Sequence, residues 1–333
     1  MQSILAVTVP FFALVLCGYL AARRHVLPES AIPGLNGYVL YFALPCLLFR
    51  FGAGTPVYQL LNPAVSVVYV ASALLIVGFT IAVTLNARVG LQNAAFGALV
   101  AAFPNTGFMG VPLLAAMLGA EAAGTVICMV LADLFITSSL CLGLAQAGAA
   151  VAGDASDKAA GKAPSGAGAA VKRALRGTLS NPMPWSIALG AVFSATDTVL
   201  PEPLATIVRM LADSATPVAL FTIGAVLWRS SQHAHHRTPV ADYLPVAMIK
   251  LFVHPTLVLA LAAAAHALGW PLTRFQILVM ALAAALPSAS NVSLLAERYG
   301  ADNGRIARII MSSTVISFVS FTALAWLFGV RPG

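Results

Sequence analysis

Apolar runs of about 20 residues recur along the whole 333-residue chain, separated by short charged or Pro- and Gly-rich segments. Only 9% of the residues are charged and 60% are hydrophobic, whereas a soluble domain contains roughly 25% charged residues. So few charges cannot cover a water-soluble surface. Because a spanning helix needs about 20 apolar residues and the runs show no two-residue alternation, the sequence predicts an all-α integral membrane protein rather than a soluble domain or an outer-membrane barrel.

The boundaries of the apolar runs predict ten transmembrane helices. A break rich in Ala, Gly and basic residues divides them five and five, so the predicted domains are residues 1–147, a cytoplasmic linker over 148–181, and residues 182–333. An odd number of spans reverses the second copy of any repeat across the membrane, so the two halves are expected to be inverted repeats. The predicted spans cover residues 3–22, 33–52, 62–85, 91–118, 121–147, 182–200, 203–229, 242–268, 273–299 and 304–329.

The basic residues of the loops predict the orientation of the chain. With the N-terminus outside, thirteen Lys and Arg residues lie in inner loops, and four lie in outer loops and the C-terminal tail. This bias predicts a multi-pass protein of the cytoplasmic (inner) membrane with both termini outside. The net charge of +7 is then explained by topology and by contact with anionic lipid, and no nucleic-acid partner is expected.

Two prolines are expected to break their helices near the middle of the membrane. Pro104 and Pro287 each lie about 13 residues into a span, which is about 20 Å along the helix. Proline removes a backbone donor, the polar residues that follow can act as N-caps, and transporters bind substrates at such breaks. Free N–H groups at the new helix ends would attract an anion; ordinary proline kinks are the alternative. The expected substrate-binding residues are Asn105, Thr106, Gly107, Ser288, Ser290 and Asn291, and Pro45 and Pro217 mark corresponding helix-break positions in the second and seventh spans.

Ionisable residues inside the spans are candidates for ion coupling, as a proton relay or as a substitute for a bound cation. They are Asp133, Lys250 and His254. A static ion pair between Asp133 and Lys250 and a packing role for His254 are the structural alternatives. Asp213 is expected to pair with Arg209, which stands four residues earlier on the same helix.

Several catalytic motifs are absent from the sequence. It contains no phosphate-binding loop, no Gly-x-Ser-x-Gly elbow and no His-Glu-x-x-His pair. We therefore expect neither an ATP-driven pump nor an enzyme, and no cofactor. The four cysteines lack metal-ligand spacing, and His233, His235 and His236 are expected to form a solvated basic loop rather than a metal site.

Four motifs in order resemble the auxin efflux carrier family, which includes plant auxin carriers and bacterial members linked to malonate or other small carboxylates. The similarity extends over nearly the whole chain. The motifs are Leu35–Phe49 (LNGYVLYFALPCLLF), Phe103–Pro112 (FPNTGFMGVP), Ala215–Gly224 (ATPVALFTIG) and Leu286–Asn291 (LPSASN).

The resemblance implies ten helices in two inverted repeats, similar to the bile-acid symporter and sodium/proton antiporter folds. Spans 1, 2, 6 and 7 would form a scaffold that dimerises, and the other spans would form a core that moves like an elevator. Spans 4 and 9 would cross at the two prolines. Asn105 matches the family's carboxylate-binding Asn, and Lys250 would replace a bound sodium ion. The third span lacks an acidic residue, so a supporting network based on one is not expected there. The polar positions of the ninth-span crossover match Ser288, Ser290 and Asn291.

The function predicted from these features is secondary transport of a small organic anion. A mono- or dicarboxylate such as malonate, or an auxin-like acid, would bind between scaffold and core, with coupling to protons or sodium. A membrane sensor or interaction protein with the same fold, and an anion channel, are the alternatives.

Overall fold

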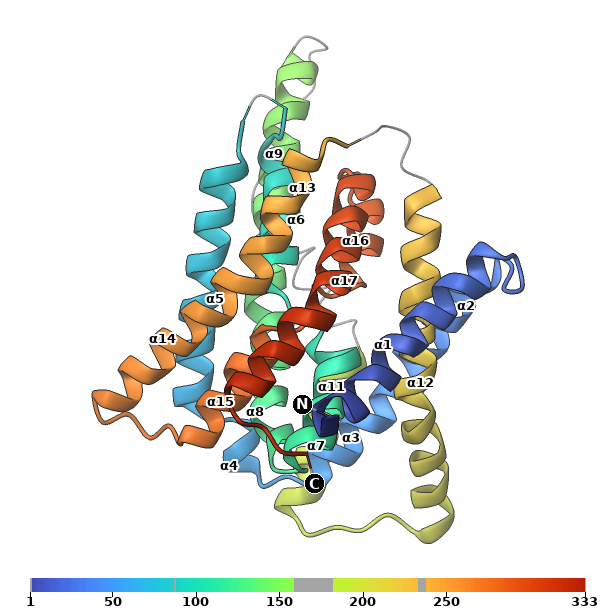
Figure 1. Ribbon diagram of the computed structural model, residues 1–333, viewed down its shortest axis with the longest axis vertical. Coiled ribbons are helices and arrows are strands. Elements are labelled where there is room, and N and C mark those ends of the chain that lie inside the picture. The colour runs from blue at the N-terminus through green and yellow to red at the C-terminus, as the bar shows by residue number, and fades with distance from the viewer. Residues whose placement is uncertain (1, 87, 159–181, 233–237, 333) are drawn as a thin grey trace.

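The computed structural model describes residues 2–86, 88–158, 182–232 and 238–332, and these are helical apart from loops and one isolated antiparallel bridge (Figure 1). Seven helical segments in the described part are long and apolar enough to cross a membrane. This confirms a multi-pass helical membrane protein. The seven segments are α1 (Gln2–Arg23), α2–η1–α3 (Ala31–Ala53), α4–α5 (Val57–Thr84), α8–η3–α9 (Ala122–Ala149), α12 (Glu202–Arg229), α13–η4–α14 (Val240–Ala267) and α17 (Asn303–Leu327).

The remaining three predicted spans are shorter or divided. Residues 91–118 form α6 (Leu91–Ala102), the π-helical turn η2 (Thr106–Gly110) and α7 (Val111–Leu118). Residues 273–299 form α15 (Arg274–Ala284) and α16 (Val292–Arg298). The two divisions fall at Pro104 and Pro287, where the sequence predicts helix breaks. The predicted span 182–200 contains α11 (Pro182–Ala195).

The long spans are assembled from shorter elements. The second predicted span consists of α2 (Ala31–Tyr38), η1 (Val39–Ala43) and α3 (Leu44–Ala53), and the third corresponds to α4 (Val57–Leu60) and α5 (Pro63–Thr84). The fifth predicted span is α8 (Ala122–Ala132), η3 (Asp133–Thr137) and α9 (Ser138–Lys158), and the eighth is α13 (Val240–Met248), η4 (Ile249–Val253) and α14 (His254–Ala267). The turns η1, η3 and η4 are π-helical, and such turns are frequent at functional sites.

Pro45 and Pro217 do not break their helices, so this expectation is corrected. Pro45 lies in the first turn of α3, directly after the wide turn η1, and the segment continues to Ala53. Pro217 lies inside α12, which runs without interruption over Glu202–Gln232. A transmembrane helix tolerates one proline when its neighbours satisfy the freed backbone groups.

Side chains fix several helix ends in the way that the sequence allows. Asn62 caps α5, because its Oδ1 accepts from the N–H groups of Ala64 (3.0 Å) and Val65 (3.1 Å). Thr273 and Gln276 form a reciprocal capping box at the start of α15. These caps define where the helices begin.

One group of helices, the scaffold group (α1, α2–η1–α3, α11 and α12), packs through close backbone contacts. α1 packs on α12, and α3 packs on α11 and α12. Gly18 and Gly224 allow the first contact, because a Cβ on Gly18 would overlap the carbonyl oxygen of Phe221 and one on Gly224 would overlap that of Val15. Small residues let helices approach in a membrane.

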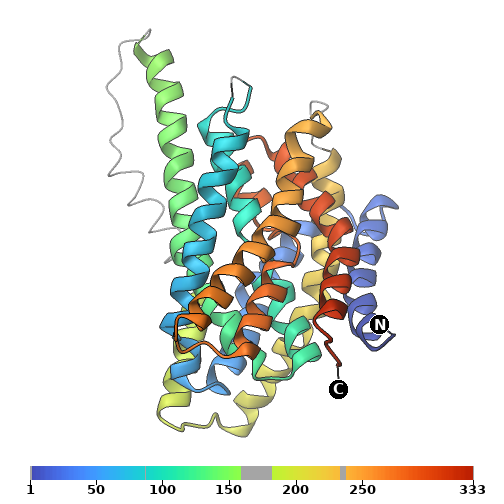
Figure 2. The same ribbon diagram turned by 60° about the vertical axis from the view of Figure 1, so that its left-hand side comes forward.

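The other helices form the core group (Figure 2). α5 packs on α6 and α14, α6 packs on α9, α14 packs on α15, and α13 packs on α17. The two groups touch where α12 meets η2 and where α1 and α12 meet α17. Both views place the two ends of the chain on the same side of the molecule and the end of α9 on the opposite side (Figures 1 and 2).

α9 continues to Lys158, so the first residues of the predicted linker are helical. The remaining linker residues 159–181, and His233, His235 and His236 of the predicted basic loop, lie outside the described residues.

Candidate functional site

The two helix breaks lie side by side in the fold. Pro104 and Ser288 form an antiparallel bridge between segments that are far apart in sequence. Two backbone hydrogen bonds hold the bridge, from Asn105 N–H to Pro287 O (2.8 Å) and from Ala289 N–H to Phe103 O (3.0 Å). Extended backbone in the interior is therefore satisfied by the opposite break, as buried polar groups require. We call residues 103–107 and 286–291 the crossover.

Ser288 replaces the donor that Pro104 lacks. In an unbroken helix the N–H of residue 104 would bond to the carbonyl of Val100, and proline has no N–H. The hydroxyl of Ser288 donates to this carbonyl at 2.7 Å. The N–H of Ser288 in turn donates to Ser313 Oγ of α17 at 3.2 Å. Ser288 thus connects both breaks.

Asn105 and Asn291 occupy the N-cap positions of η2 and α16, but neither side chain caps its helix. The capping role expected from the sequence is therefore wrong for these two residues. The Oδ1 atom of each is buried and has no hydrogen-bond partner within the described structure. Asn105 is only 2% exposed. An unsatisfied buried acceptor is uncommon and costly, so both amides are free to bind a ligand.

The other expected site residues contribute backbone groups or line cavities. Thr106 is buried, with its N–H donating to Pro104 O at 2.8 Å. Gly107 leaves room for Met183 of α11, whose methyl group would contact a Cβ there at 2.9 Å. The carbonyl of Ser290 accepts from the hydroxyl of Ser293 at 3.0 Å. The structure therefore brings all six expected substrate-binding residues to the crossover.

Two small cavities adjoin the crossover. One encloses about 260 Å³ beside Asn105 and Gly107, and its space for solvent is close to the minimum for a single water molecule. The other, of about 230 Å³ including space open to solvent, lies between the crossover and the α2 and α12 helices and has no room for a water molecule. Phe108 and Asn291 line both cavities. The first is also lined by Phe103, Pro104, Val130, Leu134, Met183 and Ala289, and the second by Asn36, Ala219, Thr222, Ile223, Val226 and Ser290.

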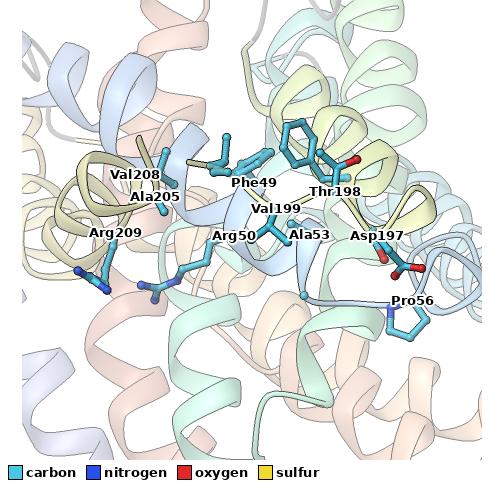
Figure 3. A pocket seen from close by; sticks show the side chains of 14 residues that line it. Phe49, Arg50, Ala53, Pro56, Asp197, Thr198, Val199, Ala205, Val208 and Arg209 are labelled. Carbon is cyan, nitrogen blue, oxygen red and sulfur yellow. The ribbon is translucent and has the colours of Figure 1, made fainter. Parts of the chain in front are cut away.

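A larger cavity lies away from the crossover, among α3, α11 and α12 (Figure 3). It encloses about 1240 Å³, including space open to solvent. The labelled side chains of Arg50 and Arg209 lie at one end of this cavity, and Asp197 lies at the other end. Arg50 is bound to Asp213 at 2.6 Å. Asp213 was expected to pair with Arg209, but the tertiary structure brings Arg50 of the second span to Asp213 instead.

The ionisable residues of the core group form a buried cluster. The hydroxyl of Tyr69 in α5 donates to Asp133 Oδ2 at 2.7 Å. Lys250 Nζ donates to the carbonyl of Ala284, the last residue of α15, at 2.5 Å and lies 3.3 Å from His254 Nδ1. Within the described structure Asp133 and Lys250 form no ion pair, so the pairing considered from the sequence is replaced by these contacts.

Three residues of the site were missed by the sequence analysis. Tyr69, Phe108 and Met183 are apolar or aromatic residues inside apolar runs, and nothing in their local sequence distinguishes them from lipid-facing neighbours. Phe108 alone lies within one of the motifs, and could have been identified from it.

A comparison with known families identifies the chain. The family profile described as "Membrane transport protein" matches residues 3–325. The chain belongs to this family. The resemblance to the auxin efflux carrier family is thereby confirmed, and the protein is a membrane transporter.

The sequence matches to three relatives cover nearly the whole of this chain. It is 31% identical to a Rhizobium meliloti protein named "Putative malonate transporter", with 100% of this chain and 98% of the relative covered. It is 28% identical to an "Uncharacterized transporter" of Methanothermobacter thermautotrophicus, covering 96% and 95% of the two chains. It is 24% identical to the "Uncharacterized transporter YfdV" of Escherichia coli, covering 97% and 96%. The names of all three relatives indicate transport rather than catalysis.

Proposed function

We propose that this protein is a secondary transporter of a small organic anion, a mono- or dicarboxylate such as malonate, which binds at the crossover. The observation that carries the proposal is the pair of crossover amides, Asn105 and Asn291, whose Oδ1 acceptors are buried and unsatisfied and which line the two small cavities. The relative named for malonate selects malonate as the first substrate to test.

Backbone donors at the first break suit a carboxylate. Among the described residues the N–H groups of Gly107 and Phe108 have no acceptor, as expected in the first turn of a helix. They begin η2–α7, which runs over Thr106–Leu118, so the positive end of its dipole points toward the Asn105 cavity. α16 has only seven residues, and its contribution is limited to the side chain of Asn291 and nearby polar atoms.

The inverted repeat predicted from the sequence gains support from an exact internal spacing. Pro10 and Pro182 are separated by 172 residues, and the same separation relates three further pairs. These pairs are Gly18 and Gly190, Pro45 and Pro217, and Gly52 and Gly224. The glycines of each half lie at the close α1–α12 and α3–α11 contacts, as expected if residues 1–147 and 182–333 are repeats joined by residues 148–181.

Transport would follow from movement of the core group against the scaffold group. The cavity that includes Asn36 and Thr222 lies between scaffold helices and the crossover, as an elevator mechanism requires. Neither crossover cavity has solvent space for more than about one water molecule, so in this mechanism malonate enters only when the core group and the scaffold group move apart. We further propose that the protein dimerises through the scaffold group.

The proposed location is the cytoplasmic (inner) membrane, with both termini outside. The Lys and Arg bias supports this orientation, and the placement of both chain ends on one side of the molecule agrees with it (Figure 1). For ion coupling, the buried cluster of Asp133, Lys250 and His254 would act as a proton relay, or Lys250 would take the place of a bound sodium ion.

The first test is counterflow in proteoliposomes. Vesicles loaded with unlabelled malonate are expected to accumulate labelled malonate from outside, and Asn105→Ala is expected to reduce the initial rate about tenfold or more. This follows because the variant leaves a buried polar group of the substrate without its hydrogen-bond partner, which costs about 1–3 kcal/mol. Asn86→Ala is the matched control, because Asn86 is exposed in a loop away from the crossover and its side chain bonds to the backbone of Thr84 at the end of α5 and of Arg88 and Val89 in the loop.

The outcomes separate the alternatives. Equal rates for wild type and Asn105→Ala, both folded, would contradict binding at the crossover. No accumulation of malonate or of other small carboxylates would favour the sensor reading, and a flux that does not saturate would favour a channel.

A further inference from the structure

We propose that the dicarboxylate is bound and transported in its singly charged form, with one carboxylate and one protonated carboxyl group. This inference rests on the proposed function and adds the charge state of the substrate. It implies that the substrate carries a proton across the membrane, so that each molecule moves with one negative charge.

The first argument is the absence of a compensating cation at the crossover. In the described structure neither crossover cavity has a charged side chain in its lining. An ion buried without a partner is strongly disfavoured, and a second uncompensated charge adds to this cost. Arg50 and Arg209 do line a cavity, but it is the larger cavity among α3, α11 and α12, away from the crossover (Figure 3).

Each ionisable group packed around the crossover has a hydrogen-bond partner that lies outside the two crossover cavities. On η4, the ammonium of Lys250 donates to Ala284 O and touches His254 of α14. On η3, Asp133 accepts from Tyr69 of α5. On α17, Arg305 donates to the carbonyls of Asn93 and Asp242 at 2.8 Å each. None of these side chains lines a crossover cavity.

The second argument is hydrogen-bond complementarity. A primary amide offers a carbonyl acceptor and N–H donors, whereas a carboxylate offers acceptors alone. The acceptors of Asn105 and Asn291 have no partner in the described structure; a dianion supplies no donor to either of them, whereas the singly charged form supplies one O–H. A protonated carboxyl group has one O–H donor and one carbonyl, and it can form two hydrogen bonds with one amide. This match holds for either orientation of the amide.

The two ends of the substrate then have different partners. The carboxylate is directed to the free N–H groups of Gly107 and Phe108, where the helix dipole favours negative charge. The carboxyl end pairs with an amide, with Asn291 placed between the two cavities. A substrate with one charged and one neutral hydrogen-bonding end fits this asymmetry.

The test compares substrates of fixed and variable charge in counterflow, with the same pH inside and outside the vesicles. Malonate loses its second proton over the chosen pH range. Malonamate has one carboxylate and one amide, so it keeps a single charge and an N–H donor. Monomethyl malonate keeps a single charge but has no donor.

For malonate, we expect the initial rate at fixed subsaturating total concentration to fall about tenfold per pH unit once the dianion predominates, in proportion to the singly charged fraction. The malonamate rate is expected to stay level over the same range, and the ester rate to be several-fold lower than that of malonamate. A malonate rate that is level or rises with pH would overturn the inference while leaving transport at the crossover intact.

Two further results would also overturn the inference. An equal fall for malonamate would assign the pH dependence to a group on the protein, and an ester rate equal to that of malonamate would remove the need for a donor. Failure of the proposed function looks different, because neither malonate nor malonamate would then exchange at any pH.

Discussion

At the scale of single residues, the crossover depends on side chains that replace missing backbone partners. Ser288 supplies the donor that Pro104 cannot give to Val100, and Lys250 supplies a donor to the last carbonyl of α15. In transporters, carbonyls at the ends of half-helices coordinate sodium ions. In this protein Lys250 Nζ already bonds to one such carbonyl, and this contact is the basis for the proposal that Lys250 takes the place of sodium.

Transport is accordingly expected to be independent of sodium. Replacing sodium by choline on both sides of the vesicles should leave the initial rate of malonate counterflow within about twofold. Lys250→Met should reduce the rate strongly in both buffers, because Ala284 O loses its donor at a buried position, which costs about 1–3 kcal/mol.

A sodium dependence that survives purification would contradict the role given to Lys250. Lys250→Arg is the matched control for charge. Transport by Lys250→Arg but not by Lys250→Met would show that this position needs a cationic donor and not only an apolar side chain that fills the space.

At the scale of elements, glycine contacts determine how the scaffold group is assembled. Gly18 of α1 and Gly224 of α12 lie where the two backbones are in direct contact. The sequence shows both glycines inside apolar helices but does not show which surface they occupy. Only the packing of α1 on α12 reveals that a methyl group has no space at either position.

Gly18→Ala and Gly224→Ala are therefore expected to destabilise the protein by about 1–3 kcal/mol each, because the added methyl group forces the helices apart. Thermal unfolding in detergent, followed by loss of the monodisperse peak in size-exclusion chromatography, measures the effect. Gly78→Ala is the control: nothing lies within 4 Å of a Cβ there, and alanine favours the helix by about 1 kcal/mol. Equal stability of all three variants would refute the close contact.

At the scale of the whole molecule, the charge bias and the arrangement of the chain ends predict one orientation. Val199 lies in the loop between α11 and α12 and is 85% exposed, and this loop should face outward. Arg88 is exposed in the loop before α6, and this loop should face the cytoplasm.

In a variant without Cys17, Cys46, Cys128 and Cys141, Val199→Cys is expected to react with a membrane-impermeant thiol reagent in intact cells. Arg88→Cys should react only after the membrane is permeabilised, because its loop is on the inner side. The reverse labelling pattern would place both termini inside.

The sequence by itself determined the helical membrane architecture, the two central breaks, and the five polar residues and one glycine near them. It could do so because hydropathy is local and because proline acts on its own helix. Tertiary structure alone decided that Asp213 pairs with Arg50, that Asp133 bonds to Tyr69 rather than Lys250, and that Asn105 and Asn291 stay unpaired. These outcomes depend on distances between residues far apart in the chain, and a local pattern carries no information about such distances.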